Sequence, residues 1–214
     1  MINQNLWENH YKKQKSILLY PDENLVRMLS HEINGLNMDG IKAIDIGCGS
    51  GRHVSLLRNF GIKHVTAADM SYNSVEMTSD HSGCFAVQCF NDKIPFKNDI
   101  FDIAVAWGSL HYADKNNTSL QIQEILRVLK KDGLLFGTLR STFDSCLKKG
   151  KQLGNNTWIT ELSDLRNSIV SFFDEDELKN IFSDFSAFEF GIIERTLPGK
   201  LNERISHWYY RARK

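Results

Sequence analysis

The stretch AIDIGCGSGRH, residues 43–53, decides the fold. It opens with an apolar run typical of a buried strand, continues into three closely spaced glycines, Gly47, Gly49 and Gly51, and leads into an amphipathic segment. In an open α/β sheet, ligands lie outside the carboxyl ends of the strands, and glycines there let a ligand approach the backbone closely. The stretch therefore predicts a ligand site where a strand ends and a helix begins.

Outward from this stretch, residues 41–140 alternate between short apolar runs and amphipathic stretches. Such alternation predicts βαβα units around a mainly parallel sheet, whose strands lack polar alternation because helices cover both faces. Two strand-like runs near the end, 186–196 and 203–214, are separated by Leu197-Pro198-Gly199 and should pair antiparallel at one edge. The predicted fold is α/β: a doubly wound, seven-stranded, mostly parallel, Rossmann-like sheet with an antiparallel edge strand and N-terminal helices.

The length of 214 residues is compatible with one domain, residues 1–214. Residues 1–40 have a helical pattern and are expected to form an N-terminal cap. Residues 141–168 are polar, contain Gly and Asn, and carry few apolar anchors, so we expect an excursion on the substrate side of the sheet.

The charge balance argues against a polyanionic partner, since Lys plus Arg and Asp plus Glu are both 26. We therefore expect no nucleic acid partner. The first residues lack the apolar core of a signal peptide, and no apolar run approaches the roughly 20 residues of a membrane span. This predicts a cytoplasmic protein without membrane association. The four cysteines show no ligand or disulfide spacing, so no metal site is expected. The oligomeric state does not follow from the sequence.

Two residues of the glycine stretch discriminate between nucleotide ligands. The dinucleotide spacing G-x-G-x-x-G requires a glycine where this chain has Arg52, which argues against a bound pyrophosphate and a nicotinamide oxidoreductase. Asp45 would repel phosphates at the strand end, but it could attract the ammonium of a bound amino acid.

The motif D-x-G-C-G-x-G resembles the first motif of the class I S-adenosylmethionine-dependent methyltransferases, and the order of later segments resembles that family through residue 140. The resemblance implies S-adenosyl-L-methionine as cofactor and S-adenosyl-L-homocysteine as product. It implies that Asp69 accepts hydrogen bonds from both ribose hydroxyls and that Met70 packs beside the adenine. The family's commonest adenine-reading acid falls on Phe90, so Asn91 and Asp92 remain alternatives for that role. The candidate cofactor-binding residues are Asp45, Gly47, Cys48, Gly49, Gly51, Asp69, Met70, Asn91, Asp92 and Trp107.

His111 is the candidate catalytic residue, because it follows the fourth strand, where family members place substrate-facing groups, and because histidine suits proton removal near neutrality. A packed structural histidine is the alternative. Arg140, at the end of the fifth strand, could grip an anionic acceptor or form a salt bridge to Asp144 or Glu161. The other candidate substrate-binding residues are Tyr11, Tyr20 and Tyr112.

The expected function is methyl transfer to an oxygen or nitrogen of a small metabolite, which would be anionic if Arg140 binds it. Two alternatives stay open. One is methylation of a nucleotide-linked sugar intermediate. The other is an accessory protein that binds S-adenosylmethionine without turnover.

Overall fold

A seven-stranded sheet organises the chain in the order β3-β2-β1-β4-β5-β10-β9, in a computed structural model that describes residues 2–13, 17–82, 84–90, 92–161 and 166–214. Strands β1 to β5 pair in parallel, and β10 runs antiparallel to both of its neighbours. The predicted α/β architecture and the antiparallel pairing of the last two runs are confirmed. The strands are β1 (Lys42–Ile46), β2 (His64–Asp69), β3 (Phe85–Gln88), β4 (Phe101–Ala106), β5 (Leu129–Arg140), β9 (Ala187–Leu197) and β10 (Lys200–Arg213).

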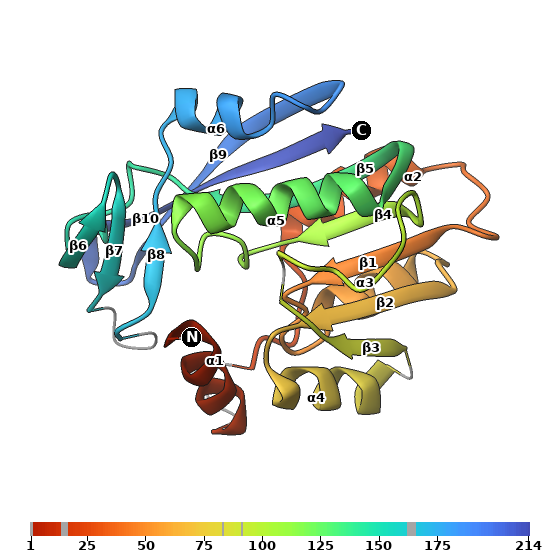
Figure 1. Ribbon diagram of the computed structural model, residues 1–214, viewed down its shortest axis with the longest axis horizontal. Helices are drawn as coiled ribbons and strands as arrows, with labels where there is room; N and C mark the ends of the chain where they lie inside the picture. Colours follow the sequence, from red (N-terminus) through yellow and green to blue (C-terminus); the bar gives the residue numbers. More distant parts are fainter. Residues whose placement is uncertain (1, 14–16, 83, 91, 162–165) are drawn as a thin grey trace.

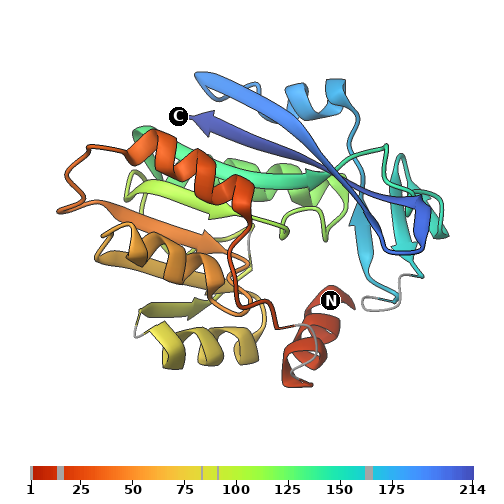
Figure 2. The same ribbon diagram turned by 180° about the vertical axis from the view of Figure 1, so that it is seen from behind.

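Helices cover the two faces of this sheet (Figures 1 and 2). Helices α2 (Glu23–Ile33) and α3 (Arg52–Asn59) pack on the face that carries Ala43, while α5 (Lys115–Val128) and α6 (Glu175–Ile181) pack on the face that carries Ile44. Helix α4 (Tyr72–Ser82) lies along β2 and β3. Because both faces are covered, β1 is buried on both sides over its last four residues.

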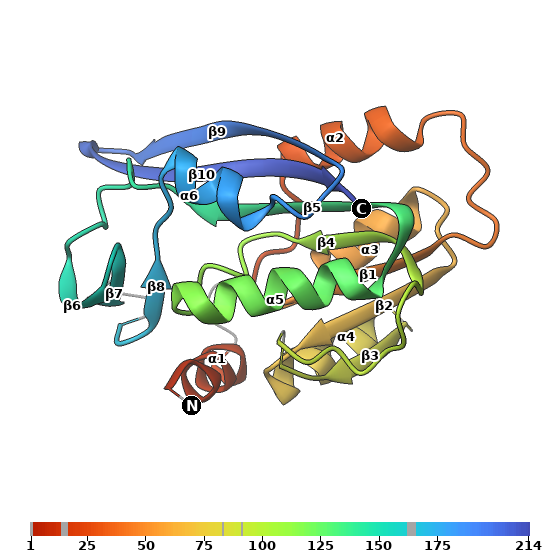
Figure 3. The ribbon, with the colours of Figure 1, turned by 45° about the horizontal axis from the view of Figure 1, so that its top comes forward.

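A smaller sheet and helix α1 (Ile2–Lys12) lie beyond the carboxyl ends of the parallel strands (Figure 3). The smaller sheet has the order β6-β7-β8 and consists of β6 (Gly150–Gly154), β7 (Thr157–Thr160) and β8 (Ile169–Ser171). The polar excursion expected over 141–168 therefore contributes β6 and β7 to this sheet. None of the described helices is long and apolar enough to cross a membrane.

Polar contacts at both ends hold α1 in place. The Asn3 side chain donates to the carbonyl oxygens of Tyr112, at 2.6 Å, and Ile169, at 3.1 Å, and it accepts from the Ile169 amide at 2.9 Å. At the other end, the Glu8 carboxylate accepts from the amides of Tyr72, at 2.8 Å, and Asn73, at 3.3 Å, where α4 begins. Helix α1 thus bridges β8 and α4 across the carboxyl edge of the sheet.

Candidate functional site

The turn after β1 has a backbone that only glycine adopts easily. Gly47, Gly49 and Gly51 have φ angles of 72°, 54° and 78°, in the left-handed region that disfavours side chains. The amide of Gly49 donates to the Asp69 carboxylate at 3.0 Å. The end of β2 therefore fixes the shape of the glycine turn.

Asp69 closes β2 and is 5% exposed. Its second oxygen accepts from the Ser71 amide at 2.9 Å. Burial raises the pKa of the carboxyl group, and the two backbone hydrogen bonds oppose that shift. The carboxylate also lines the cavity next to the glycine turn, where it can accept further hydrogen bonds from a ligand.

Asp45 is a fully buried carboxyl group, and neither of its oxygens has a hydrogen-bond partner among the described residues. Burial raises its pKa to about 7, although the nearby Arg52 guanidinium lowers it. His53 Nδ1 lies 3.9 Å from Asp45 Oδ1, and burial lowers the pKa of His53 to about 3, so this ring is neutral. A buried carboxylate without a partner is costly, and it would be stabilised by a cation.

The cavity at the glycine turn is small because α1 fills it. Its free volume is about 40 Å³, whereas small-molecule sites usually measure several hundred cubic ångströms. The Tyr11 hydroxyl lies where a Cβ on Gly49 would stand, 2.5 Å from that position. The Trp7 ring stacks on Tyr11 at 5.8 Å and meets Tyr112 edge-on at 4.9 Å between centroids. The residues that line the cavity are Trp7, Tyr11, Gly47, Asp69, Met70, Gly108, Ser109 and Tyr112.

His111 packs against Tyr112, with 4.4 Å between ring centroids, is 1% exposed, and is not among the residues that line the cavity. Burial holds its pKa well below the ordinary value, helped by His207 and Arg140. The ring is hydrogen-bonded to the backbone of Thr138, and Nδ1 has no partner among the described residues. Because its pKa is held low, the His111 ring is neutral near pH 7.

Arg140 is buried and paired with Asp144, with 2.8 Å between Nη1 and Oδ2. Asp144 is also bound by the amides of Cys146, at 2.7 Å, and Ser206, at 3.0 Å. The guanidinium thus has the salt bridge to Asp144 that the sequence left as one alternative, while its Nε has no partner among the described residues. His207 lies opposite Arg140 in the β5/β10 register.

The structure brings together only some of the residues that the sequence singled out. Tyr11, Gly47, Asp69, Met70 and Tyr112 share the cavity. Cys48 contributes its backbone to the turn, but its thiol contacts Ser74 and Thr78 in the interior, and burial raises the thiol pKa. Gly51 faces Thr78 rather than the cavity.

Three further candidates lie away from the cavity. Trp107 packs in the core, edge-on to His53 at 6.5 Å. Tyr20 is 81% exposed and contributes its carbonyl oxygen to Arg52. Asp92 is exposed and does not line the cavity, and Asn91 lies outside the described residues. Their proposed roles stay predictions.

Sequence reasoning missed the two polar residues that dock α1, Asn3 and Glu8, and the histidine beside Arg140, His207. Contacts between residues so distant in sequence leave no local pattern. The loop after β4 was noted, but not the role of Ser109, whose Cβ would stand 2.3 Å from a Cβ on Gly47.

Comparisons with known proteins match part of this chain. A family model described as "Methyltransferase domain" matches residues 44–137. The human protein named "Arginine-hydroxylase NDUFAF5, mitochondrial" is 30% identical over 98 residues, which cover 45% of this chain and 28% of that protein. The human "Probable tRNA methyltransferase 9B" is 32% identical over 92 residues, which cover 42% of this chain and 19% of that protein. The chain spans less than half the length of the curated relatives it matches.

Solved structures share the fold. An S-adenosylmethionine-dependent methyltransferase from Mesorhizobium loti superimposes with a TM-score of 0.69 at 16% identity. The match covers 89% of this chain and 96% of that one. At this identity the likeness concerns the fold alone.

Proposed function

We propose that this chain transfers the methyl group of S-adenosylmethionine to an oxygen or nitrogen of a small metabolite. Residues 44–137 match a methyltransferase-domain model, and the chain shares the fold of S-adenosylmethionine-dependent methyltransferases. The observation that carries the proposal is the fully buried Asp45 carboxylate near the glycine turn, whose oxygens accept no hydrogen bond from the part of the chain that the structure describes. The amino-acid end of S-adenosylmethionine carries an ammonium group that would stabilise this charge.

The residues around the turn fit the rest of the cofactor. Asp69 lines the cavity and can accept from two vicinal ribose hydroxyls. Met70, on the same wall, would pack against the adenine. Because Gly49 has no side chain, a cofactor could lie close to the backbone there. In this conformation the Tyr11 hydroxyl occupies that space. Helix α1 must therefore move outward before a ligand of this size can enter.

The bound cofactor supplies an electrophilic methyl group, and this chain has to orient the acceptor and remove its proton. Positioning contributes most of the rate in such an in-line displacement. We assign acceptor binding to Tyr112 and Tyr11, which face the cavity. His111 is the assigned base, because its ring is neutral and its Nδ1 has no hydrogen-bond partner among the described residues. Since Tyr112 separates His111 from the cavity, a shift of the Tyr112 ring would have to accompany proton transfer.

The state of Arg140 indicates which acceptor charge this site can accommodate. Its pairing with Asp144 offsets its charge locally, which favours a neutral or singly charged acceptor over a nucleotide-linked sugar. One relative is named as a probable tRNA methyltransferase. For this chain, the formal net charge of +0 disfavours a tRNA acceptor, because binding to a polyanion relies on positive charge. The small cavity would support the accessory-protein alternative if α1 could not move.

A two-stage screen tests the proposal. Thermal unfolding of the full chain with S-adenosylmethionine, S-adenosylhomocysteine and NAD should show stabilisation by the first two alone. Incubation with fractionated metabolite pools should then release S-adenosylhomocysteine in a fraction-dependent way. Stabilisation without release from any fraction would support the accessory protein, and stabilisation by NAD would contradict the cofactor assignment.

A further inference from the structure

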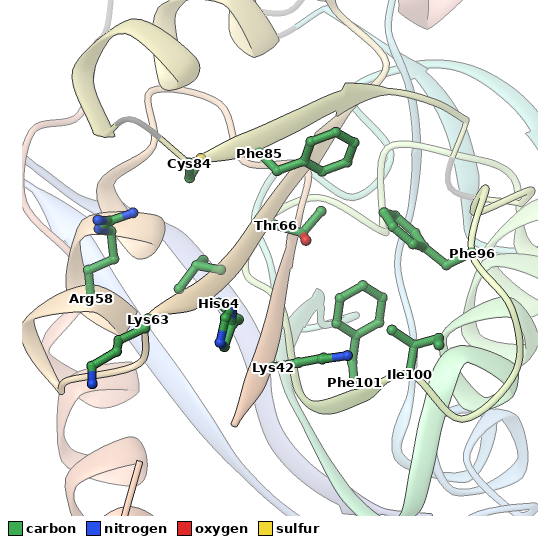
Figure 4. Close-up of a pocket in the computed structure, with 11 residues that line it drawn as sticks. Lys42, Arg58, Lys63, His64, Thr66, Cys84, Phe85, Phe96, Ile100 and Phe101 are labelled. Atoms are coloured by element: carbon green, nitrogen blue, oxygen red, sulfur yellow. The ribbon is translucent and has the colours of Figure 1, made fainter. Parts of the chain in front are cut away.

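A second cavity opens at the opposite edge of the sheet, where the parallel strands begin (Figure 4). Its volume is about 380 Å³, within the usual range of small-molecule sites. β2 begins with His64 at this cavity and ends with Asp69 at the other one. At about 3.3 Å per residue, the two sites lie on the order of 17 Å apart along the strand.

The cavity exists because the connection from β3 to β4 contains no helix in its described part, residues 89–90 and 92–100. A parallel crossover usually carries a helix that covers the sheet face. Here Ile94, Phe96 and Ile100 from an irregular segment pack on the core beneath α5. The amino ends of β2 and β3 keep an uncovered face, on which Thr66 and Phe85 are register partners.

Basic side chains gather at this cavity, and none of the described lining residues is acidic. The four are Lys42, Arg58, Lys63 and His64. Lys63 is paired with Asp39 at 2.8 Å, whereas no ion pair involves Lys42 or Arg58 within the described ranges. Lys42 and His64 begin adjacent strands and are register partners. The Asp102 carboxylate accepts from the Lys42 amide at 2.9 Å, but its ion pair is with Lys130. The Lys42 and Arg58 side chains therefore remain without an ion pair among the described residues.

Aromatic rings form the other end of the cavity (Figure 4). Phe85 meets Phe96 edge-on at 6.3 Å, and Phe96 meets Phe101 edge-on at 5.1 Å. Phe85 is 63% exposed, although its neighbours in the series are partly or fully buried. An exposed ring at the end of an aromatic series offers a stacking surface for a planar group.

We propose that this cavity binds a small aromatic anion of the nucleoside monophosphate class. The base packs against Phe85 and Phe96, and the phosphate lies near Lys42 and His64. Cationic and aromatic groups at the two ends of one cavity match the two ends of such a molecule. The volume suits a single nucleotide rather than a nucleic acid strand.

Calorimetric titration of the full chain with uridine 5′-monophosphate tests the proposal, with uridine and inorganic phosphate as half-ligand probes. The monophosphate should bind more tightly than either half. Lys42→Gln and Phe85→Ala should each weaken binding about fivefold or more, and both side chains are exposed, so the fold should persist. Lys131→Gln and Phe143→Ala, at exposed positions away from this cavity, should bind like the wild type.

Asp69→Ala distinguishes this cavity from the glycine-turn site, because it should leave binding of uridine 5′-monophosphate unchanged. Loss of uridine 5′-monophosphate binding in Asp69→Ala would overturn the proposal. It would also be overturned if the wild type did not bind this ligand, or if Lys42→Gln and Phe85→Ala bound it as tightly as the wild type. A short oligouridylate that binds far more tightly than the monophosphate, with a steep salt dependence, would replace the proposed ligand with a single-stranded RNA.

Discussion

The phenol oxygen of Tyr11 stands against Gly49, 2.5 Å from the position that a Cβ on this glycine would take. Tyr11 comes from the N-terminal helix, and Gly49 lies in the turn after the first strand. The contact shows that α1 closes the space where the glycine turn is open to a ligand. We therefore expect cofactor entry to require displacement of α1.

Glu8→Ala should speed cofactor association, because it removes the carboxylate that ties α1 to the amides of Tyr72 and Asn73. We expect the association rate of S-adenosylhomocysteine, followed by stopped-flow tryptophan fluorescence, to rise several-fold. Glu76→Ala, an exposed change on α4, is the control. An unchanged rate in Glu8→Ala would show that the docked helix does not limit entry.

Asp45→Asn should stabilise the unliganded protein in a pH-dependent way. The folded pKa of about 7 lies above the ordinary value of 3.8, so the folded state binds an extra proton between these values. The contribution of Asp45 to the free energy of unfolding is therefore fully present below about pH 4, and it is lost as the pH rises through 7. At pH 8 the substitution should add up to about 4 kcal/mol, since one pKa unit corresponds to about 1.4 kcal/mol.

Urea unfolding of the wild type and Asp45→Asn across this pH range measures the difference. We expect the difference in free energy of unfolding between Asp45→Asn and the wild type to grow from pH 5 to pH 8. A constant gap would mean that Asp45 is compensated in the folded state.

His111→Ala should lower kcat by roughly 10² to 10⁴ if the ring removes the acceptor's proton. Because burial holds the His111 pKa well below 6.5, the base stays neutral at pH 6.5, and wild-type activity should fall only at lower pH. The variant should lose this acidic limb and keep its affinity for S-adenosylhomocysteine. His31→Ala, on exposed α2 surface, is the matched control. An acidic limb retained in His111→Ala would assign the ionisation to another group.

Arg140→Ala should destabilise the protein, because it leaves the buried Asp144 carboxylate without its cation, at a cost of about 3 to 5 kcal/mol. Arg140→Met combined with Asp144→Asn removes both charges and keeps a carbonyl oxygen for one of the two amides that Asp144 binds, so it should recover part of that stability. If Arg140 also holds an anionic acceptor, KM for the acceptor should stay raised in the double variant while kcat changes little. If the double variant kept the wild-type KM for the acceptor, Arg140 would act only through its salt bridge to Asp144.

The sheet could be predicted from sequence because its signals are local. The glycine stretch marks the end of β1, and alternation of apolar runs marks the strands that follow. The smaller sheet could not be predicted in this way, because β6 (Gly150–Gly154) is exposed over four of its five residues and has no apolar pattern.

The site was only partly predictable for a different reason. The pattern placed Asp45 and Asp69 at strand ends, but the isolation of the Asp45 carboxylate depends on three-dimensional burial. The docking of α1 depends on Asn3 and Glu8, whose partners lie 64 to 166 residues away. Such contacts form no periodic pattern along the chain.

Calorimetric titration with S-adenosylhomocysteine shows whether the glycine turn and the end of β2 hold S-adenosylmethionine. Wild-type protein should bind one equivalent. Asp69→Ala should weaken binding by about 1.5 to 3 kcal/mol, the range for hydrogen bonds to a charged group, while the control Asp176→Ala, at an exposed position on α6, changes it little. Absence of binding to the wild type, or equal affinity in Asp69→Ala, would contradict the account.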